Sequence, residues 1–271
     1  MNGLNNNIYK TVYFFAPHGE ETREVHDELS DIFSRHGIEE VSVSDDADII
    51  ASIGGDGEFL QSVRKNNFRE DCVYLGIAVD GANYFYVDFH YRDIKTLEEA
   101  IDQDNLDVRN YPLLEVSIND NKPSYCLNEF TLRSSIVKTI KMDVYINDFL
   151  FEQFNGDGIL VATPTGSTGY NKSLGGSVVD PLIHAMQVTE LASVNNNTHR
   201  TLGTSFLLNK ERPLTLLIDK NLDYYPIMSL DNEAISVRNT EKVEVSISDK
   251  LIKTLKLKDN TFWHKAQRNF L

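Results

Sequence analysis

The tetrapeptide Gly54-Gly55-Asp56-Gly57 is the first segment of this chain whose residue types could do chemistry. Three glycines within four residues let the backbone turn sharply and bring it close to a ligand. If a helix begins at Glu58, its first N–H groups and positive dipole end form a phosphate-binding position at the same point. Asp56 is poorly suited to bind phosphate, but its carboxylate could take a proton from a hydroxyl or hold Mg²⁺. An ordinary glycine-rich turn with a solvent-facing Asp explains the tetrapeptide equally well.

The second segment is the polar pair Asn128-Glu129, which lies within the strand-like run Tyr125–Ser135. Neighbouring residues of a strand point to opposite faces, so at least one of the two side chains points inward. A buried Asn or Glu needs polar partners, and a ribose diol or an adenine edge supplies them. On its own, such a pair is more often an edge-strand pair that faces water.

The third segment, Gly156–Gly176, runs from an apolar strand, Ile159–Ala162, into a loop rich in hydroxyls and glycines. Tyr170 offers a flat face to a ring, and Lys172 offers one positive charge. No Lys-Ser/Thr follows a Gly-x-x-x-x-Gly, so the segment is not a P-loop. We interpret it as a ligand-binding loop in preference to a long surface loop.

In this order the three segments resemble the motifs of the NAD kinase family: Gly-Gly-Asp-Gly, Asn-Glu and Thr-Pro-Thr-Gly-Ser-Thr-Ala-Tyr. The similarity covers nearly the whole chain and is strongest from Tyr125 to Gly203, with Asn195-Asn196 included. The resemblance implies a kinase that moves the terminal phosphoryl group of ATP, or polyphosphate, onto the adenosine ribose 2′-hydroxyl of NAD. It also implies a divalent metal cation (Mg²⁺), a cytoplasmic location and a homo-oligomer, either a dimer or a tetramer. The metal ligands are not specified.

Carried over position by position, the resemblance makes Asp56 the catalytic proton acceptor and places Gly57 beside it in the NAD site. Asn128 and Glu129 would hold the adenosine half, and Asp157 would lie near the nicotinamide. Asp231 matches a late acidic position near the path of the phosphoryl group. The other NAD-binding positions that the resemblance implies are Asn155, Thr165, Thr168, Gly169, Tyr170, Asn171, Lys172, Ser173, Ala192 and Asn232.

The chain departs from the family pattern at four positions: Glu58 stands where Thr is usual, Gly169 where Ala is usual, Tyr84 where a glycine is usual, and Asn155 where some members have a basic residue. Glu58 adds a negative charge at the expected phosphate position. We therefore expect Glu58 either to point away from the phosphates or to help hold Mg²⁺. The Tyr84 side chain would crowd the approach to the backbone that a glycine allows.

Two other functions are compatible with parts of this pattern. A lipid kinase of the diacylglycerol or sphingosine type shares the Gly-Gly-Asp-Gly turn, although the Asn-Glu pair and the Thr/Ser/Gly loop suit a dinucleotide better. A non-catalytic NAD-binding regulator is the second, because Glu58 and Tyr84 depart from the pattern of the enzymes.

The charge and hydropathy of the chain narrow the classes of partner that it is expected to bind. The chain has 26 Lys and Arg against 41 Asp and Glu, a formal net charge of −15, and we find no basic patch. Such a charge predicts no binding to nucleic acid or to an anionic membrane. No apolar run is long enough to span a bilayer, and the Asn-rich start lacks the apolar stretch of a signal peptide. Cys72 and Cys126 lie in apolar surroundings and are expected to be buried free thiols. These features favour the cytoplasm.

The first hundred residues alternate between strand-like and helix-like segments, which predicts a parallel α/β layer. The predicted strands are Thr11–Ala16, Val41–Ser44, Asp48–Ile53 and Val73–Val79, and the predicted helices are Glu21–His36, Glu58–Lys65 and Arg92–Gln103.

From about Tyr111 most segments are strand-like. They are Leu113–Asn119, Ser124–Arg133, Thr139–Asn147, Phe149–Phe154, Leu214–Asp219, Tyr224–Leu230, Ile235–Val237, Lys242–Ser248 and Leu251–Lys258. One helix, Ile183–Leu191, is expected among them, with Asp180 as its N-cap. We expect an α/β N-terminal domain plus a mostly-β C-terminal domain, a two-domain NAD-kinase-like architecture. Its parts would be residues 1–109 with the glycine turn, residues 110–248 for NAD, and a segment, 249–271, that can pack back on the first domain.

Overall fold

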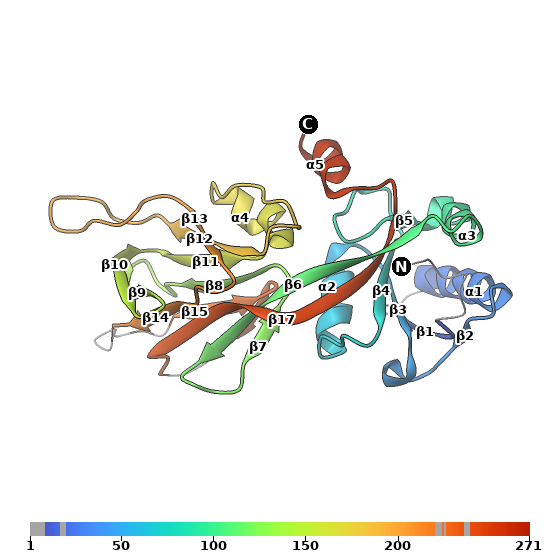
Figure 1. The fold of residues 1–271 in the computed structure, drawn as a ribbon, viewed down its shortest axis with the longest axis horizontal. Coiled ribbons are helices and arrows are strands. Elements are labelled where there is room, and N and C mark those ends of the chain that lie inside the picture. The colour runs from blue at the N-terminus through green and yellow to red at the C-terminus, as the bar shows by residue number, and fades with distance from the viewer. Residues whose placement is uncertain (1–8, 17–19, 220–223, 225, 236–238) are drawn as a thin grey trace. The chain divides into compact units, whose positions relative to one another are not determined.

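The computed structural model describes residues 9–16, 20–219, 224, 226–235 and 239–271. The chain forms two compact units: unit 1 comprises Met1–Tyr111 and Leu251–Leu271, and unit 2 comprises Pro112–Lys250. Two long strands, β6 (Leu106–Ile118) and β17 (Lys242–Leu257), each run through both units (Figure 1).

Unit 1 is built on a parallel sheet in which β4 has β3 on one side and the end of β17 on the other, followed outward from β3 by β1 and β2. A short strand, β5, also pairs with β4. Every residue of β3 and β4 is buried, as expected for strands covered on both faces. The strands are β1 (Thr11–Phe15), β2 (Glu39–Glu40), β3 (Ile49–Ile53), β4 (Val73–Ala78) and β5 (Phe89–His90).

The helices of unit 1 cover both faces of this sheet (Figure 1). Alternate residues of β3 pack with the apolar faces of α1 and α3 in one core, while Phe59 of α2 contacts Tyr74 on the other face, 6.2 Å between ring centroids. The helices are α1 (Glu20–Arg35), α2 (Asp56–Lys65), α3 (Lys95–Asp102) and α5 (Phe262–Phe270), with 3₁₀ turns η2 (Ser44–Asp46) and η3 (Tyr91–Asp93).

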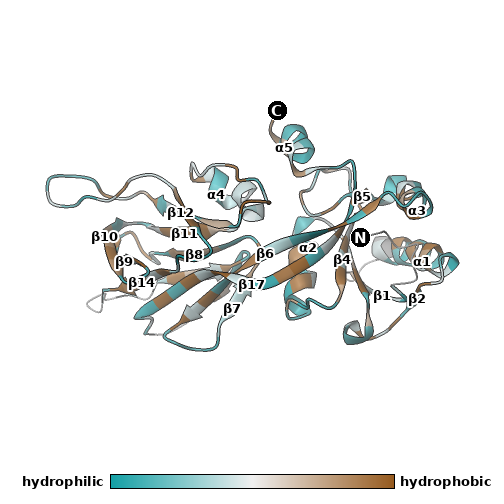
Figure 2. Ribbon diagram, viewed as in Figure 1, coloured by the Kyte–Doolittle hydropathy of each residue, from teal (hydrophilic) through white to brown (hydrophobic). Residues whose placement is uncertain are grey.

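Unit 2 is a sandwich of two antiparallel sheets. One has the order β13-β12-β11-β8-β15-β16, and the other contains β10-β9-β14-β17 together with the β6–β7 pair. Apolar residues from both sheets form one core, and hydropathy alternates along β17 accordingly (Figure 2). The strands are β7 (Ser124–Cys126), β8 (Glu129–Arg133), β9 (Ile140–Ile146), β10 (Phe149–Gly156), β11 (Gly158–Ala162), β12 (Ala185–Leu191), β13 (Phe206–Asn209), β14 (Leu214–Ile218), β15 (Ile227–Leu230) and β16 (Glu233–Ile235).

The segment after β11 folds against the outer face of the six-stranded sheet. It contains a 3₁₀ turn, η4 (Thr165–Thr168), and a single helical turn, α4 (Tyr170–Ser173). Tyr170 and Leu174 pack on Leu160 and Leu191 there. This packing holds the hydroxyl-rich loop on the sheet as an ordered element.

The expected fold class is confirmed: an α/β N-terminal region is followed by a mostly-β region. The predicted helix Ile183–Leu191 is wrong, because Ala185–Leu191 is strand β12, paired with β11 and β13. Met186 and Val188 enter the sandwich core, while Gln187 and Thr189 face the loop on the outer side. This two-residue alternation is what the helical interpretation overlooked.

Several predicted strand boundaries also change. Val41–Ser44 is not a strand, because β2 ends at Glu40 and η2 begins at Ser44. The run Ser124–Arg133 breaks into β7 and β8 around Leu127-Asn128. The two runs predicted at Lys242–Ser248 and Leu251–Lys258 form one strand, and β13 was not predicted. Residues 225 and 236–238, within the predicted strands Tyr224–Leu230 and Ile235–Val237, lie outside the described residues.

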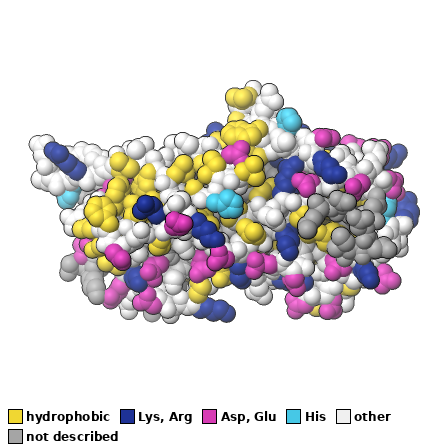
Figure 3. Space-filling model, viewed as in Figure 1, with side chains coloured by type: hydrophobic (Ala, Val, Ile, Leu, Met, Phe, Trp, Pro, Cys, Tyr) yellow, Lys and Arg dark blue, Asp and Glu magenta, His cyan; other side chains and the backbone are white. Residues whose placement is uncertain are grey.

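Acidic and basic side chains are interspersed on the face drawn in Figure 3. Among the described residues, no helix combines the length and the apolar character that crossing a membrane requires.

Candidate active site

The glycine turn lies at the carboxyl end of β3, and α2 begins at Asp56. Ligands of α/β sheets bind at this edge, and a helix N-terminus there favours negative charge. Gly54 has φ +141°, which few other residues adopt, and its N–H donates to the carbonyl of Ile77 at 2.8 Å. Gly57 is exposed in the first turn of α2. The turn therefore presents Asp56 at the end of the helix.

The Asp56 carboxylate is held by two backbone donors. The N–H of Phe85 donates to Oδ2 at 2.9 Å, and the N–H of Tyr86 donates to Oδ1 at 2.7 Å. Burial raises the pKa of Asp56, while these hydrogen bonds and the nearby Lys256 and Lys265 act to lower it. The result is an oriented carboxylate that can accept a proton.

Glu58 folds back onto the glycine turn, and its part in holding Mg²⁺ stays a prediction. Its Oε2 accepts a hydrogen bond from the N–H of Gly55 at 2.9 Å, as the N3 residue of a capping box does. The N–H groups of Gly54 and Gly55 are therefore both engaged within the chain. A phosphate at these two donors would have to compete with Glu58.

Tyr84 covers the same turn. A Cβ atom on Gly55 would lie 2.5 Å from the Tyr84 ring, so the ring rests directly on the glycine backbone. The Tyr84 hydroxyl donates to Asp80 at 2.8 Å, and burial together with Asp80 raises the pKa of Tyr84 to about 12. The crowding expected from this departure is present.

In unit 2, Asp231 organises the predicted Asn-Glu segment. Its carboxylate accepts the N–H groups of Leu127 at 2.8 Å and Asn128 at 2.6 Å, and its own N–H donates to the carbonyl of Glu129 at 3.0 Å. Asp231 and the exposed Asn232 both have positive φ and form the turn between β15 and β16. The strand break at Asn128 is thus held by a carboxylate 103 residues away in sequence.

The Glu129 side chain is the least satisfied polar group of this region. It is 7% exposed, and its Oε2 has no hydrogen-bond partner among the described residues. Burial, with Asp231 nearby, raises the pKa of Glu129 to about 8, so the carboxyl is protonated at neutral pH. A Cβ on the exposed Gly169 would lie 3.6 Å from this oxygen. A buried polar atom beside an exposed glycine is suited to meet a ligand.

Hydroxyl groups join the third motif to the Asn-Glu segment. Thr163 Oγ1 donates to the carbonyl of Leu127 at 2.6 Å, and Thr165 Oγ1 lies 3.0 Å from Thr163 Oγ1. Thr168 Oγ1 donates to the carbonyl of Thr165 at 3.2 Å. A Cβ on Gly166 would lie 2.1 Å from the Asn128 carbonyl oxygen, so only glycine permits this close approach. The two motifs therefore form one structural group.

The rest of the loop divides into buried and exposed positions. The fully buried Asn171 amide bonds to Gln187 at 3.2 Å and to Thr189 at 2.7 Å, which fixes the loop to β12. The Tyr170 hydroxyl accepts from Arg133 at 3.3 Å, while Lys172 and Ser173 are exposed. Asn171 thus shapes the loop, and its predicted contact with NAD stays a prediction.

Three other predicted positions, Asn155, Asp157 and Ala192, lie together at the Gly158 end of β11. This end is about 13 Å along the strand from its Ala162 end, where the third motif begins. The N–H of Asp157 donates to Leu191 at 2.8 Å, and Ala192 follows with φ 44°. The carbonyl of Asn155 accepts from Val194 at 2.7 Å, which brings Asn155, Asp157 and Ala192 together.

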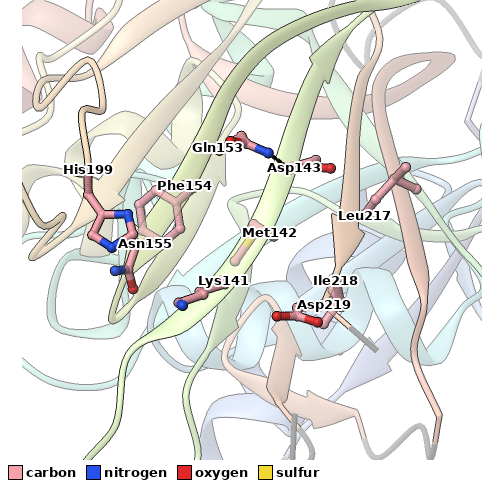
Figure 4. Close-up of a pocket in the computed structure, with 10 residues that line it drawn as sticks. All are labelled: Lys141, Met142, Asp143, Gln153, Phe154, Asn155, His199, Leu217, Ile218 and Asp219. Atoms are coloured by element: carbon pink, nitrogen blue, oxygen red, sulfur yellow. Dashed lines mark hydrogen bonds between the residues drawn. The ribbon is translucent and has the colours of Figure 1, made fainter. Parts of the chain in front are cut away.

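Asn155 is also buried, and its Oδ1 has no hydrogen-bond partner among the described residues. It lines a pocket of about 380 Å³ in unit 2 with Lys141, His199 and Asp219 (Figure 4). As the resemblance to the family indicated, this chain has the neutral Asn155 where some members have a basic residue.

Sequence reasoning missed three buried charged residues near Asp56: Asp88, Lys256 and Lys265. The side chains of the two lysines are 1% and 2% exposed, and that of Asp88 is fully buried. In the sequence, Lys256 lies in a strand of alternating polar and apolar residues and Lys265 lies in a short helix, so both resemble ordinary surface charges. The apolar run around Asp88 was the only signal that a charge there is buried.

The chain does not build a metal cage of its own in the described part. No group of three or more His, Cys, Asp or Glu side chains there is arranged to hold a metal ion. The nearest carboxylates, Asp56 and Glu58, each accept backbone N–H groups. Mg²⁺ commonly binds substrate phosphates together with only one or two protein carboxylates, and its place in this protein stays a prediction.

Comparison with solved structures defines the class of the fold. The yeast NADH kinase complexed with NADH superimposes with a TM-score of 0.81 at 19% identity, covering 98% of this chain and 89% of the yeast chain. An NAD kinase from Archaeoglobus fulgidus in complex with ATP gives a TM-score of 0.74 at 19% identity, covering 95% and 98%. The fold is that of the NAD and NADH kinases.

Sequence comparison is more specific. Residues 127–257 match the ATP-NAD kinase C-terminal domain. NAD kinase 2 of Bacillus subtilis (strain 168) is 52% identical over 262 residues, covering 97% of this chain and 98% of the relative. The chain belongs to the NAD kinase family. These relatives do not favour the lipid kinase or the non-catalytic regulator.

Proposed function

We propose that this NAD kinase moves the terminal phosphoryl group of ATP onto the adenosine ribose 2′-hydroxyl of NAD and releases ADP and NADP. The observation that carries the proposal is the 52% identity to an NAD kinase over 97% of the chain. Identity at this level over both units supports the same reaction and not the fold alone.

Asp56 serves as the proton acceptor. The 2′-oxygen attacks the γ-phosphorus in line, the bond from phosphorus to the β,γ-bridging oxygen breaks, and the hydroxyl proton passes to Asp56. The two backbone donors, Phe85 and Tyr86, fix the carboxylate in one orientation, which supports this role. Gly57 lies beside it in the first helical turn.

Unit 2 holds NAD. The protonated Glu129 can donate a hydrogen bond from its carboxyl, whose Oε2 has no partner among the described residues, and Asn128 offers an amide beside it. Gly169, which lies between Thr168 and Tyr170 in the loop, borders the same carboxyl, and all three are proposed to contact NAD. The remaining positions proposed to contact the dinucleotide are Asn155, Asp157, Thr165, Asn171, Lys172, Ser173, Ala192 and Asn232.

A divalent cation, Mg²⁺, accompanies the ATP phosphates and neutralises charge that develops on them. The polyphosphate donor, the cytoplasmic location and the homo-oligomer rest on the family resemblance, and sedimentation of the purified protein tests the last of these.

A coupled assay tests the reaction. The protein is incubated with NAD and ATP, with and without Mg²⁺, and NADP is read out with an NADP-specific dehydrogenase. We expect NADP only when ATP, NAD and Mg²⁺ are all present. Parallel reactions with polyphosphate in place of ATP decide the donor. If the protein binds NAD but forms no NADP under any condition, a non-catalytic NAD-binding regulator becomes the better hypothesis.

A further inference from the structure

Two buried lysines, Lys256 and Lys265, reach the backbone of the loop whose N–H groups hold Asp56. Lys265 of α5 donates to the carbonyl of Phe85 at 2.6 Å, and Lys256 of β17 donates to the carbonyl of Tyr86, which belongs to the next peptide along the chain. Both side chains are at least 98% buried, so each ammonium is largely removed from water. A buried ammonium is costly unless it is paired and hydrogen-bonded, which makes an accidental arrangement improbable.

The bond from Lys265 is arranged in series with the bond to Asp56. The carbonyl of Phe85 and the N–H of Tyr86 belong to the same peptide group. Lys265 binds the oxygen of that group, and Asp56 binds its hydrogen. Hydrogen bonds in series polarise one another. The Lys265 ammonium that donates to the peptide oxygen therefore strengthens the hydrogen bond from the peptide N–H to the Asp56 carboxylate. One peptide thus links the two side chains.

Asp88 balances the two lysines. Its Oδ1 pairs with Lys265 and lies 3.8 Å from Lys256, and its Oδ2 accepts the N–H of Leu257 at 2.9 Å. With Asp56, the cluster holds two carboxylates and two ammonium groups. Arg109, Tyr84 and Tyr111 are further titratable groups that face it. Burial lowers the pKa of both lysines, that of Lys256 to about 7, and the carboxylates of Asp88 and Asp56 oppose this effect.

The helix that carries Lys265 is fixed to the same loop by packing. The rings of Phe262 and Phe270 lie 5.7 Å and 5.6 Å from the Phe85 ring. Arg109 donates to the carbonyls of Leu257 and Asn260, each at 2.8 Å, at the turn that leads into α5. The helix is therefore held against Phe85 from both ends.

We propose that Lys265, supported by Lys256 and Asp88, is a positioning residue for the phosphoryl transfer: it holds the Phe85–Tyr86 peptide that orients the Asp56 carboxylate. The inference rests on the role of Asp56 proposed above. The C-terminal helix is then part of the catalytic apparatus, although it touches neither substrate in this account.

The test compares Lys265→Met with Lys258→Met, measuring kcat, KM for NAD, NAD affinity by calorimetry and thermal unfolding. Lys258 is a matched control, because it also bonds a backbone carbonyl and an aspartate, Asp104, but is exposed and away from the cluster. Misplacement of a catalytic group by about 1 Å costs about 10²-fold, so we expect a loss of that order in kcat for Lys265→Met. NAD affinity should stay within about threefold, and Lys258→Met should be unaffected.

Conservative rescue separates positioning from bulk stability. Lys265→Arg keeps a charged donor and should recover about tenfold of the lost kcat. If Lys265→Met does not fold, the charge-balanced Asp88→Asn/Lys265→Met variant is measured in its place, and its kcat should remain low. A folded variant lacking Lys265 that keeps more than about a third of wild-type kcat overturns the proposal.

Asp56→Asn is measured in the same series so that two failures can be told apart. An active Asp56→Asn enzyme refutes the proton-acceptor role itself. An inactive Asp56→Asn enzyme beside a fully active Lys265→Met enzyme refutes only the positioning role.

Discussion

Two buried carboxyl groups, Asp56 in unit 1 and Glu129 in unit 2, are treated in opposite ways by their surroundings. Burial raises the pKa of both. At Asp56 two backbone N–H groups and two lysines oppose that effect, whereas at Glu129 the neighbouring Asp231 adds to it. A carboxylate whose charged form is hydrogen-bonded by fixed donors suits proton acceptance, and a carboxyl kept protonated suits hydrogen-bond donation.

The difference teaches that chemistry and binding can be separated in this molecule. The groups around Asp56 restrain one carboxylate, while in the described part of the chain the groups around Glu129 leave its buried Oε2 without a partner. Substitutions in the first region should change turnover, and substitutions in the second should change affinity for NAD.

The largest effect is expected for Asp56→Asn. The change is nearly isosteric and removes only the basic carboxylate, so turnover should fall by ~10²–10⁴. NAD affinity, measured by calorimetry, should change by no more than a few fold. Activity above about a tenth of wild type would remove Asp56 from the proton-acceptor role.

Asn128→Ala and Glu129→Ala should weaken NAD binding by about 1–3 kcal/mol, because each leaves a polar edge of the nucleotide unpaired. Calorimetry on the folded protein measures this loss, and thermal unfolding serves as its control. A steep fall in thermal stability with unchanged NAD affinity in the folded fraction would instead make the pair structural.

Glu58→Thr should lower the KM for ATP without changing the affinity for NAD. The substitution frees the N–H of Gly55 and removes a charge that, at about 4–6 Å and an effective dielectric near 20, repels a phosphate by roughly 3–4 kcal/mol. Steady-state kinetics at saturating NAD over a Mg²⁺ series measure the change. An equal KM for ATP at every Mg²⁺ level would leave Glu58 as a helix cap only.

The last prediction concerns the pH dependence of stability at Glu129. Its folded pKa, about 8, lies above the ordinary value of 4.5, so between these values the unfolded chain loses a proton that the folded chain keeps. This contribution to stability is present below pH 4.5 and is lost as the pH rises through 8. Glu129→Gln removes the dependence, so its stability relative to wild type should rise from pH 5 to pH 8 in denaturant titrations. Parallel curves across that range would contradict the raised pKa.

The fold class could be read from the sequence because strand and helix periods are local. The prediction failed at Ala185–Leu191, where both faces of a strand are covered by the same unit and polar Gln187 and Thr189 are buried against the loop. The apolar–polar alternation of Met186 to Thr189 is only four residues long and the next residue, Glu190, interrupts it, so the period is easily misjudged.

The motifs could likewise be predicted, but not the groups that hold them. Asp231 bonds to Leu127 and Asn128 across more than a hundred residues, and Lys265 meets Phe85 across 180. Such long-range contacts cannot be inferred from the spacing of residues along the chain. The fold of Glu58 back onto Gly55 was missed for a different reason, because a helix N-terminus attracts either a side chain or a ligand and the sequence is equally consistent with both.

The most direct test of this division measures kcat and NAD affinity on the same preparations of Asp56→Asn and Asn128→Ala. The account predicts a crossed pattern, in which Asp56→Asn loses turnover and keeps NAD, while Asn128→Ala loses affinity for NAD and keeps kcat at saturation. If each variant lost turnover and affinity together, chemistry and binding would not be separable and the account would be contradicted.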